Sequence, residues 1–133
     1  MNAPQKLDFV LSQFFGSQAF QRFGLTNNVS SEGVTYFATE MGAFWLLDSI
    51  SACLAEMALN GKDVDFAVIK IKPLTDQTMY MASIVIEDGN DEVIYIHNVE
   101  FTDLDFDRLP DDFQIWAGRN ELNGFTLYLP SEH

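Results

Sequence analysis

The sequence predicts an α+β domain in which amino-terminal helices pack on one face of an antiparallel sheet of about five strands. Apolar residues recur at helical spacing as far as Asn60 and Gly61. Beyond this point the pattern changes to alternation in segments rich in β-branched and aromatic residues. No linker or internal repeat interrupts the 133 residues, so we expect a single domain over residues 1–133, helical over 1–61 and sheet over 62–133.

A first helical segment is expected before Gly16, because large apolar residues recur there on one helix face: Leu7, Val10, Leu11, Phe14 and Phe15. Ser17 can cap a further helical turn that carries Phe20 and Phe23. The polar segment 24–31 is typical of a loop.

The next helix is expected to begin at Ser30 or Ser31, since either side chain can serve as an N-cap. Glu32 then lies in the first turn, where the helix dipole favours a negative charge. Gly42 interrupts the apolar spacing and predicts a bend or a close helix contact.

The segment 43–54 is apolar on more than one face, so we expect it to form the central buried helix, with its end at Asn60 and Gly61. Trp45 and Cys53 are expected in its core. Because Cys53 is the single cysteine, the chain can form neither an internal disulfide nor a zinc site of several thiolates.

Five strands are expected in the second half of the chain. Three consecutive antiparallel strands over 65–72, 78–87 and 92–101 are separated by the turn signals PLTDQ and DGND. Two shorter strands over 113–117 and 125–129 are joined across GRNELNG.

The charge balance excludes several classes of partner. Seven basic and twenty acidic side chains give a net charge of −13, which opposes direct nucleic-acid binding and binding to an anionic membrane surface. The chain contains no apolar stretch of the length that a signal peptide or a membrane span requires. We therefore expect a cytoplasmic protein.

Few residues are available for nucleophilic catalysis. The two histidines are His133, the last residue, and His97, which lies in a predicted strand and is expected to pack on the face shared by Val93, Tyr95, Val99 and Phe101. The sequence contains no phosphate-binding loop, HExxH motif or nucleophile elbow. We expect no catalytic residue and no cofactor.

Two acidic segments resemble the sequences of metal-binding sites. Asp103, Asp105 and Asp107 imitate the opening of an EF-hand loop, but Arg108 stands where the turn glycine belongs. The second segment surrounds Gly89 and is equally typical of a hairpin turn: Asp88, Asn90 and Glu92. We expect solvated acidic loops and no bound metal at either place.

Half of the acidic residues fall within 26 positions, where Arg108 is the single base. They are Glu87, Asp88, Asp91, Glu92, Glu100, Asp103, Asp105, Asp107, Asp111 and Asp112. In an extended segment, carboxylates at i and i+2 lie about 6.6 Å apart on one face, roughly twice the rise per nucleotide of one DNA strand. Asp103, Asp105 and Asp107 could thus present a phosphate-like row.

Trp116 follows this acidic segment in a short predicted strand. Because tryptophan is enriched among binding hot spots, Trp116 is a candidate interface anchor. The alternative is that it packs under the sheet.

Three segments resemble an uncharacterised family of small bacterial, plasmid and phage proteins. They are GVTYFATEMGAFWLLDSI, FTDLDF and the terminal LYLPSE, in the same order as in the family. The most specific part is the GA-aromatic-WLLD helix over 42–48, and the family ends in a strand like LLLPSEY. This chain departs from the pattern at His133, where the family has tyrosine, at Glu32, where it usually has aspartate, and in an extended loop, GRNELNG.

The resemblance implies a setting of mobile genetic elements, and it implies no activity or site residues. We expect an acidic, non-enzymatic interaction protein that docks on a basic surface as a nucleic-acid mimic and inhibits a DNA- or RNA-processing enzyme, such as a CRISPR effector. Three alternatives stay open: a carboxylate-dependent metal-binding protein or metal-assisted hydrolase, a structural homo-oligomer, and acidity that serves solubility alone.

Overall fold

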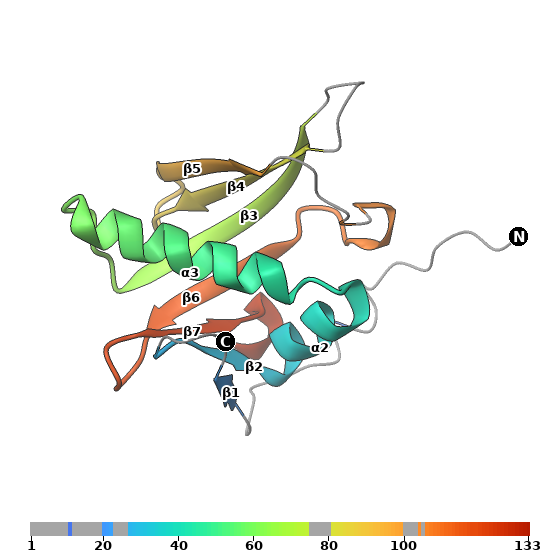
Figure 1. The fold of residues 1–133 in the computed structure, drawn as a ribbon, viewed down its shortest axis with the longest axis horizontal. Helices are drawn as coiled ribbons and strands as arrows, with labels where there is room; N and C mark the ends of the chain where they lie inside the picture. Colours follow the sequence, from blue (N-terminus) through green and yellow to red (C-terminus); the bar gives the residue numbers. More distant parts are fainter. Residues whose placement is uncertain (1–10, 12–19, 23–26, 75–80, 100–103, 105) are drawn as a thin grey trace, which may run out of the picture.

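The computed structural model describes residues 11, 20–22, 27–74, 81–99, 104 and 106–133. These residues form a mixed sheet with α-helices on one of its faces (Figure 1). The strands that they form are β1 (Phe20–Arg22), β2 (Val29–Ser31), β3 (Phe66–Leu74), β4 (Met81–Glu87), β5 (Val93–Val99), β6 (Gln114–Arg119) and β7 (Phe125–Tyr128). Their order in the sheet is β1-β2-β7-β6-β3-β4-β5. The predicted α+β class is confirmed.

Two details of the predicted sheet are wrong. The described residues form seven strands rather than about five, and β2 pairs with β7 in parallel, so the sheet is not purely antiparallel. The three consecutive strands β3, β4 and β5 do pair antiparallel as predicted, and β6 pairs antiparallel with both β3 and β7.

The two additional strands lie in the part that we expected to be helix and loop. Phe20–Arg22 forms β1 instead of a helical turn, and Val29–Ser31 forms β2 instead of the end of a loop. Both strands have three residues, too few for an alternating pattern to stand out. The helix expected over 7–15 lies outside the described residues apart from Leu11, which is helical and buried.

The helix α2 (Glu32–Met41) begins where the sequence predicts, and Gly42, where we expected a bend or a close helix contact, is its C-cap. The Val34 N–H donates to the Ser31 hydroxyl at 3.2 Å, so Ser31 is the N-cap. The helix ends at Gly42, whose φ of 59° is left-handed backbone that favours glycine.

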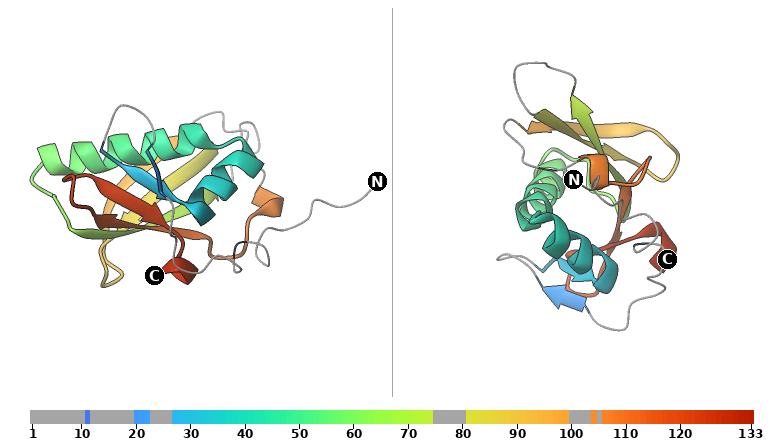
Figure 2. Two further views of the ribbon diagram at one scale, coloured as in Figure 1. Left: turned by 90° about the horizontal axis from the view of Figure 1, so that it is seen from below. Right: turned by 90° about the vertical axis from the view of Figure 1, so that its right-hand side faces the viewer.

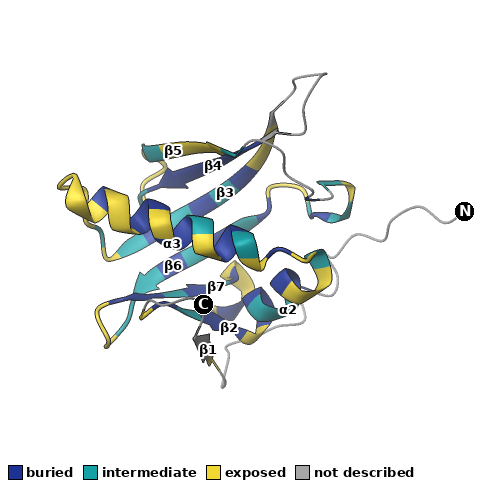
Figure 3. Cartoon of the chain, in the orientation of Figure 1, coloured by how far each residue is buried: buried dark blue, intermediate teal, exposed yellow. Residues whose placement is uncertain are grey.

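The helix α3 (Phe44–Leu59) runs across the sheet, with its buried residues toward the strands and its exposed residues toward solvent (Figure 3). Cys53 is buried as predicted. Trp45 is partly buried against the core rather than enclosed by it.

The carboxy-terminal residues hold the start of α2. Glu132, in the short 3₁₀ helix η2 (Pro130–Glu132), is buried, and its carboxylate accepts hydrogen bonds from the Ser31 hydroxyl at 2.5 Å and the Gly33 N–H at 3.2 Å. It also accepts the Leu129 N–H at 2.9 Å. A Cβ on Gly33 would lie 2.7 Å from Leu129 Cδ1 and 2.8 Å from Glu132 Oε1, so a larger residue there would displace these side chains.

We call the sheet face under α2 and α3 the inner face, and the opposite face the outer face. Alternate residues of β3, namely Ala67, Ile69 and Ile71, are buried on the inner face. Seen from below, both α-helices lie on the same side of the strands (Figure 2, left). Within the described parts of the chain, no helix is long and apolar enough to cross a membrane.

Candidate interaction surface

The turn between β4 and β5 holds the first group of predicted site residues. Asp88 Oδ1 accepts the N–H groups of Asn90 at 2.8 Å and of Glu92 at 3.0 Å, so this carboxylate closes the turn. Asp91 has a left-handed φ of 65°, and both Asp91 and Glu92 are exposed. This hairpin tip therefore presents acidic side chains to solvent while Asp88 maintains its shape.

Glu87, which we expected on the acidic surface, is buried on the outer face of β4 and only 5% exposed. Its carboxylate lies 3.0 Å from Lys70 Nζ on the neighbouring strand. Because this ion pair neutralises the charge locally, Glu87 contributes to the sheet rather than to an exposed acidic surface.

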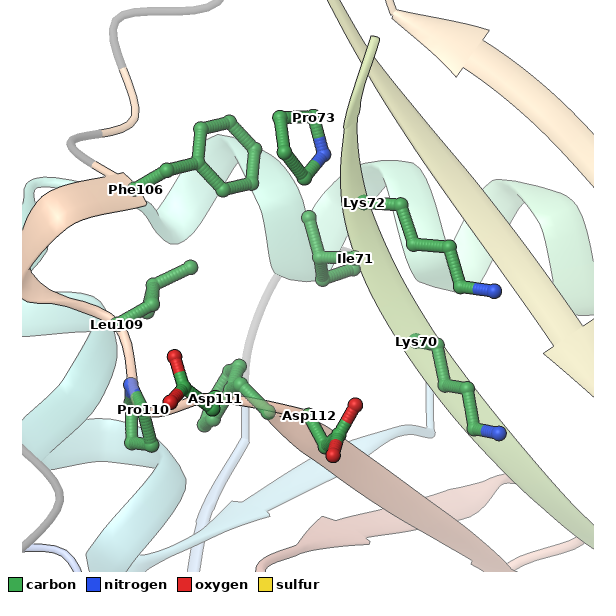
Figure 4. Close-up of a pocket in the computed structure, with 10 residues that line it drawn as sticks. Lys70, Ile71, Lys72, Pro73, Phe106, Leu109, Pro110, Asp111 and Asp112 are labelled. Carbon is green, nitrogen blue, oxygen red and sulfur yellow. The ribbon is translucent and has the colours of Figure 1, made fainter.

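A second group of acids lies in and after the 3₁₀ helix η1 (Phe106–Arg108). Asp107, Asp111 and Asp112 are exposed. Asp111 and Asp112 line an open cavity of about 460 Å³ whose other wall is formed by Lys70–Pro73 of β3, and whose apolar lining includes Phe106 (Figure 4). Since Lys70 and Lys72 line the same cavity, the negative potential is partly compensated here.

The structure places the two acidic groups at opposite ends of the sheet (Figure 1). The hairpin tip lies beside Phe66 at the start of β3, while the second group lies beside Ile71 and Pro73 near its end. Three predicted residues lie outside the described part of the chain: Glu100, Asp103 and Asp105. Of the three aspartates in the predicted phosphate-like row, the structure therefore describes Asp107 alone.

Trp116 lies on the outer face and is half-buried within a group of rings. The Trp116 ring is 5.5 Å from that of Phe66, 6.2 Å from that of Tyr128 and 5.3 Å from that of His133, with interplanar angles of 82°, 80° and 71°. We call these four residues the aromatic cluster. The sequence indicated Trp116 alone, because the other rings join it through strand pairing and through the chain end.

His97 is exposed, so our expectation of a packed histidine is wrong. His97 lies on β5 opposite Ile84 of β4, toward the inner face. The helix α3 contacts β5 at Tyr95, whose hydroxyl donates a hydrogen bond to Glu56 Oε2 at 2.6 Å. Among the described residues, no group of three or more histidine, cysteine or acidic side chains could hold a metal ion.

The comparisons with known proteins identify a family without a known activity. A model of DUF6876, a family of unknown function, matches residues 5–133. No curated protein and no solved structure matches the chain.

Proposed function

The chain belongs to DUF6876, a family of unknown function, and we propose that it is a non-enzymatic interaction protein that docks on a basic surface of a partner protein. The observation that supports this proposal most strongly is the exposure of the acids at the hairpin tip and in and after η1 on a chain of net charge −13. Surface charges of one sign produce an electrostatic field that accelerates association with an oppositely charged surface and repels surfaces of the same charge.

The partner that fits best is a protein whose basic surface normally binds nucleic acid. Such a surface carries lysine and arginine residues spaced to contact phosphates, and exposed carboxylates in the turns beside the sheet can occupy those contacts. We therefore propose that the protein acts as a nucleic-acid mimic and inhibits a nucleic-acid-processing enzyme in the setting of a mobile genetic element. The resemblance to plasmid and phage proteins supports this setting.

Capture from a lysate of the native host tests the proposal. The immobilised protein is expected to retain a partner at about 0.05 M NaCl and to release it at about 0.5 M NaCl, because exposed ion pairs are screened at high salt. Duplex DNA added at low salt should release the same partner. A variant with the exposed Asp91, Glu92 and Asp107 changed to asparagine, glutamine and asparagine should capture at least about tenfold less partner, which corresponds to about 1.4 kcal/mol of binding free energy.

A matched variant controls for net charge. Glu32→Gln, Asp48→Asn and Glu121→Gln together remove the same three charges from exposed positions outside residues 87–112. This variant should capture the partner as the unchanged protein does. Capture that persists at high salt and in the variant of Asp91, Glu92 and Asp107 would show that acidic docking is not the function.

A further inference from the structure

We propose that an arginine-bearing segment of the basic partner binds on the outer face of the sheet, over the aromatic cluster and beside the hairpin tip. This inference rests on the proposed function and assigns the docking surface and the chemistry of the partner segment. It is carried by apolar side chains on the face opposite α2 and α3, by the geometry of four rings and by the acids at their edge.

The outer face presents apolar side chains that α2 and α3 do not cover, because both lie on the inner face. Strand pairing places Val68, Trp116 and Tyr128 in one row across β3, β6 and β7, and all three are half-buried. On the far strand β5, Val93 is 48% exposed and Ile96 is 58% exposed. Figure 2 shows both α-helices on the other side of the sheet. An exposed apolar face of this kind is typical of a protein interface.

The aromatic cluster has the chemistry of a cation site. The Trp116 Nε1–H donates to Gln114 Oε1 at 3.0 Å, so the polar edge of the indole already has a partner within the chain. The three neighbouring rings stand nearly perpendicular to the indole, and those of Tyr128 and His133 stack at an interplanar angle of 12°. Aromatic ring faces attract ammonium and, more often, guanidinium groups.

The hairpin tip supplies charge complementarity next to these rings. A Cβ on Gly89 would lie 3.4 Å from Phe66 Cδ1, so the tip touches the edge of the aromatic cluster. Asp91 and Glu92 are exposed in the same turn. A guanidinium that stacks on the rings can also form hydrogen bonds to these carboxylates, and its planar shape suits both contacts better than an ammonium does.

A second copy of the chain fits this face less well than a basic segment does. Each copy carries a net charge of −13, and pairing of the two outer faces would bring two acidic hairpin tips to the same interface. Like charges at an interface oppose association. The acidic hairpin tip therefore favours a partner of opposite charge.

The test measures binding of a labelled nona-arginine peptide, with nona-lysine in comparison, by fluorescence anisotropy at about 0.05 M NaCl. Thr126→Arg adds a bulky cation to the outer face beside Gly118 without removing a ring, and it should weaken nona-arginine binding at least about fivefold. Ala52→Arg adds the same charge to the exposed side of α3 and should weaken it by less than about twofold. Trp116→Leu should weaken nona-arginine binding more than nona-lysine binding, with circular dichroism as the check on folding.

Two further variants separate this inference from the proposed function. Asp91→Asn with Glu92→Gln should weaken binding of the arginine peptide more than Asp111→Asn with Asp112→Asn at the other end of the sheet. The acidic variants could weaken peptide binding while Thr126→Arg weakens it no more than Ala52→Arg does. That result would support docking through acidic residues and would show that the outer face is not the docking surface. If no acidic variant has an effect, the proposed function itself fails. Light scattering that shows a dimer abolished by Thr126→Arg would instead assign the face to a second copy.

Discussion

Glu132 shows how a single residue connects segments that are distant in the chain. Its buried carboxylate accepts hydrogen bonds from Ser31 and Gly33 at the start of α2. Glu132→Gln keeps the shape but removes the charge, and we expect it to lower the free energy of unfolding by about 1–2 kcal/mol, because hydrogen bonds to charged groups are stronger than neutral ones. Urea denaturation measures the change. Glu121→Gln, at an exposed position, should change stability by less than about 0.5 kcal/mol, and equal effects of the two variants would refute this role.

The buried Cys53 thiol leads to a prediction about how the stability of the protein depends on pH. Burial, and secondarily the charge of Glu56, raises the pKa of the Cys53 thiol from its ordinary value of 9.0 to about 11. Because the folded state favours the neutral thiol, its contribution to stability is complete below pH 9 and is lost as the pH rises toward 11. A disulfide reagent should leave the native thiol unmodified at pH 8 and modify it in urea.

A variant isolates this effect from other groups that titrate at high pH. Tyr95, whose pKa is raised to about 12 mainly by its hydrogen bond to Glu56, also contributes above pH 10. Cys53→Ala should therefore lose less stability between pH 9 and pH 11 than the unchanged chain, although it starts from a lower value because of the cavity. Parallel stability curves for the two proteins would contradict the assignment.

At the scale of elements, the β4–β5 hairpin depends on Asp88. Its carboxylate accepts two backbone N–H groups of the turn. We expect Asp88→Ala to lower the free energy of unfolding by about 1 kcal/mol, whereas Asp88→Asn should cost less, since an amide oxygen can accept the same bonds. Denaturation in the presence and absence of calcium measures both. A calcium-dependent stability that Asp88→Ala removes would mean that the turn is a metal site.

Local patterns predicted the elements that local interactions determine. The helical spacing and Ser31 located α2 and α3, and alternation located β3 to β5 within a few residues, because those signals lie in or directly beside each element. The strand β2 was missed because its partner β7 lies almost one hundred residues away, with Val29 opposite Thr126. The three residues of β2 form too short a pattern to indicate a pairing partner so distant in the chain.

At the scale of the whole molecule, the same limit applies to the candidate surface. The sequence located the acids correctly as a segment, but their separation into two ends of the sheet follows from the direction of β5, which carries the chain from the hairpin tip to the opposite end. The aromatic cluster combines Phe66, Trp116, Tyr128 and His133 from three strands and the chain end. Trp116 could be singled out by residue type, whereas its neighbours required the register of β3, β6 and β7.

The net charge of −13 leads to a prediction for the molecule as a whole. Folding concentrates like charges, and added salt screens their repulsion, so the midpoint of thermal unfolding should rise by several degrees between about 0.01 and 0.15 M NaCl. At fixed 0.15 M NaCl, about 1 mM calcium or magnesium chloride should shift the midpoint by less than about 1 °C, because solvated carboxylates do not bind the ions specifically. Differential scanning calorimetry measures both effects. A specific site would add stability that grows with the logarithm of metal concentration, and such growth would favour the metal-binding alternative over acidic docking.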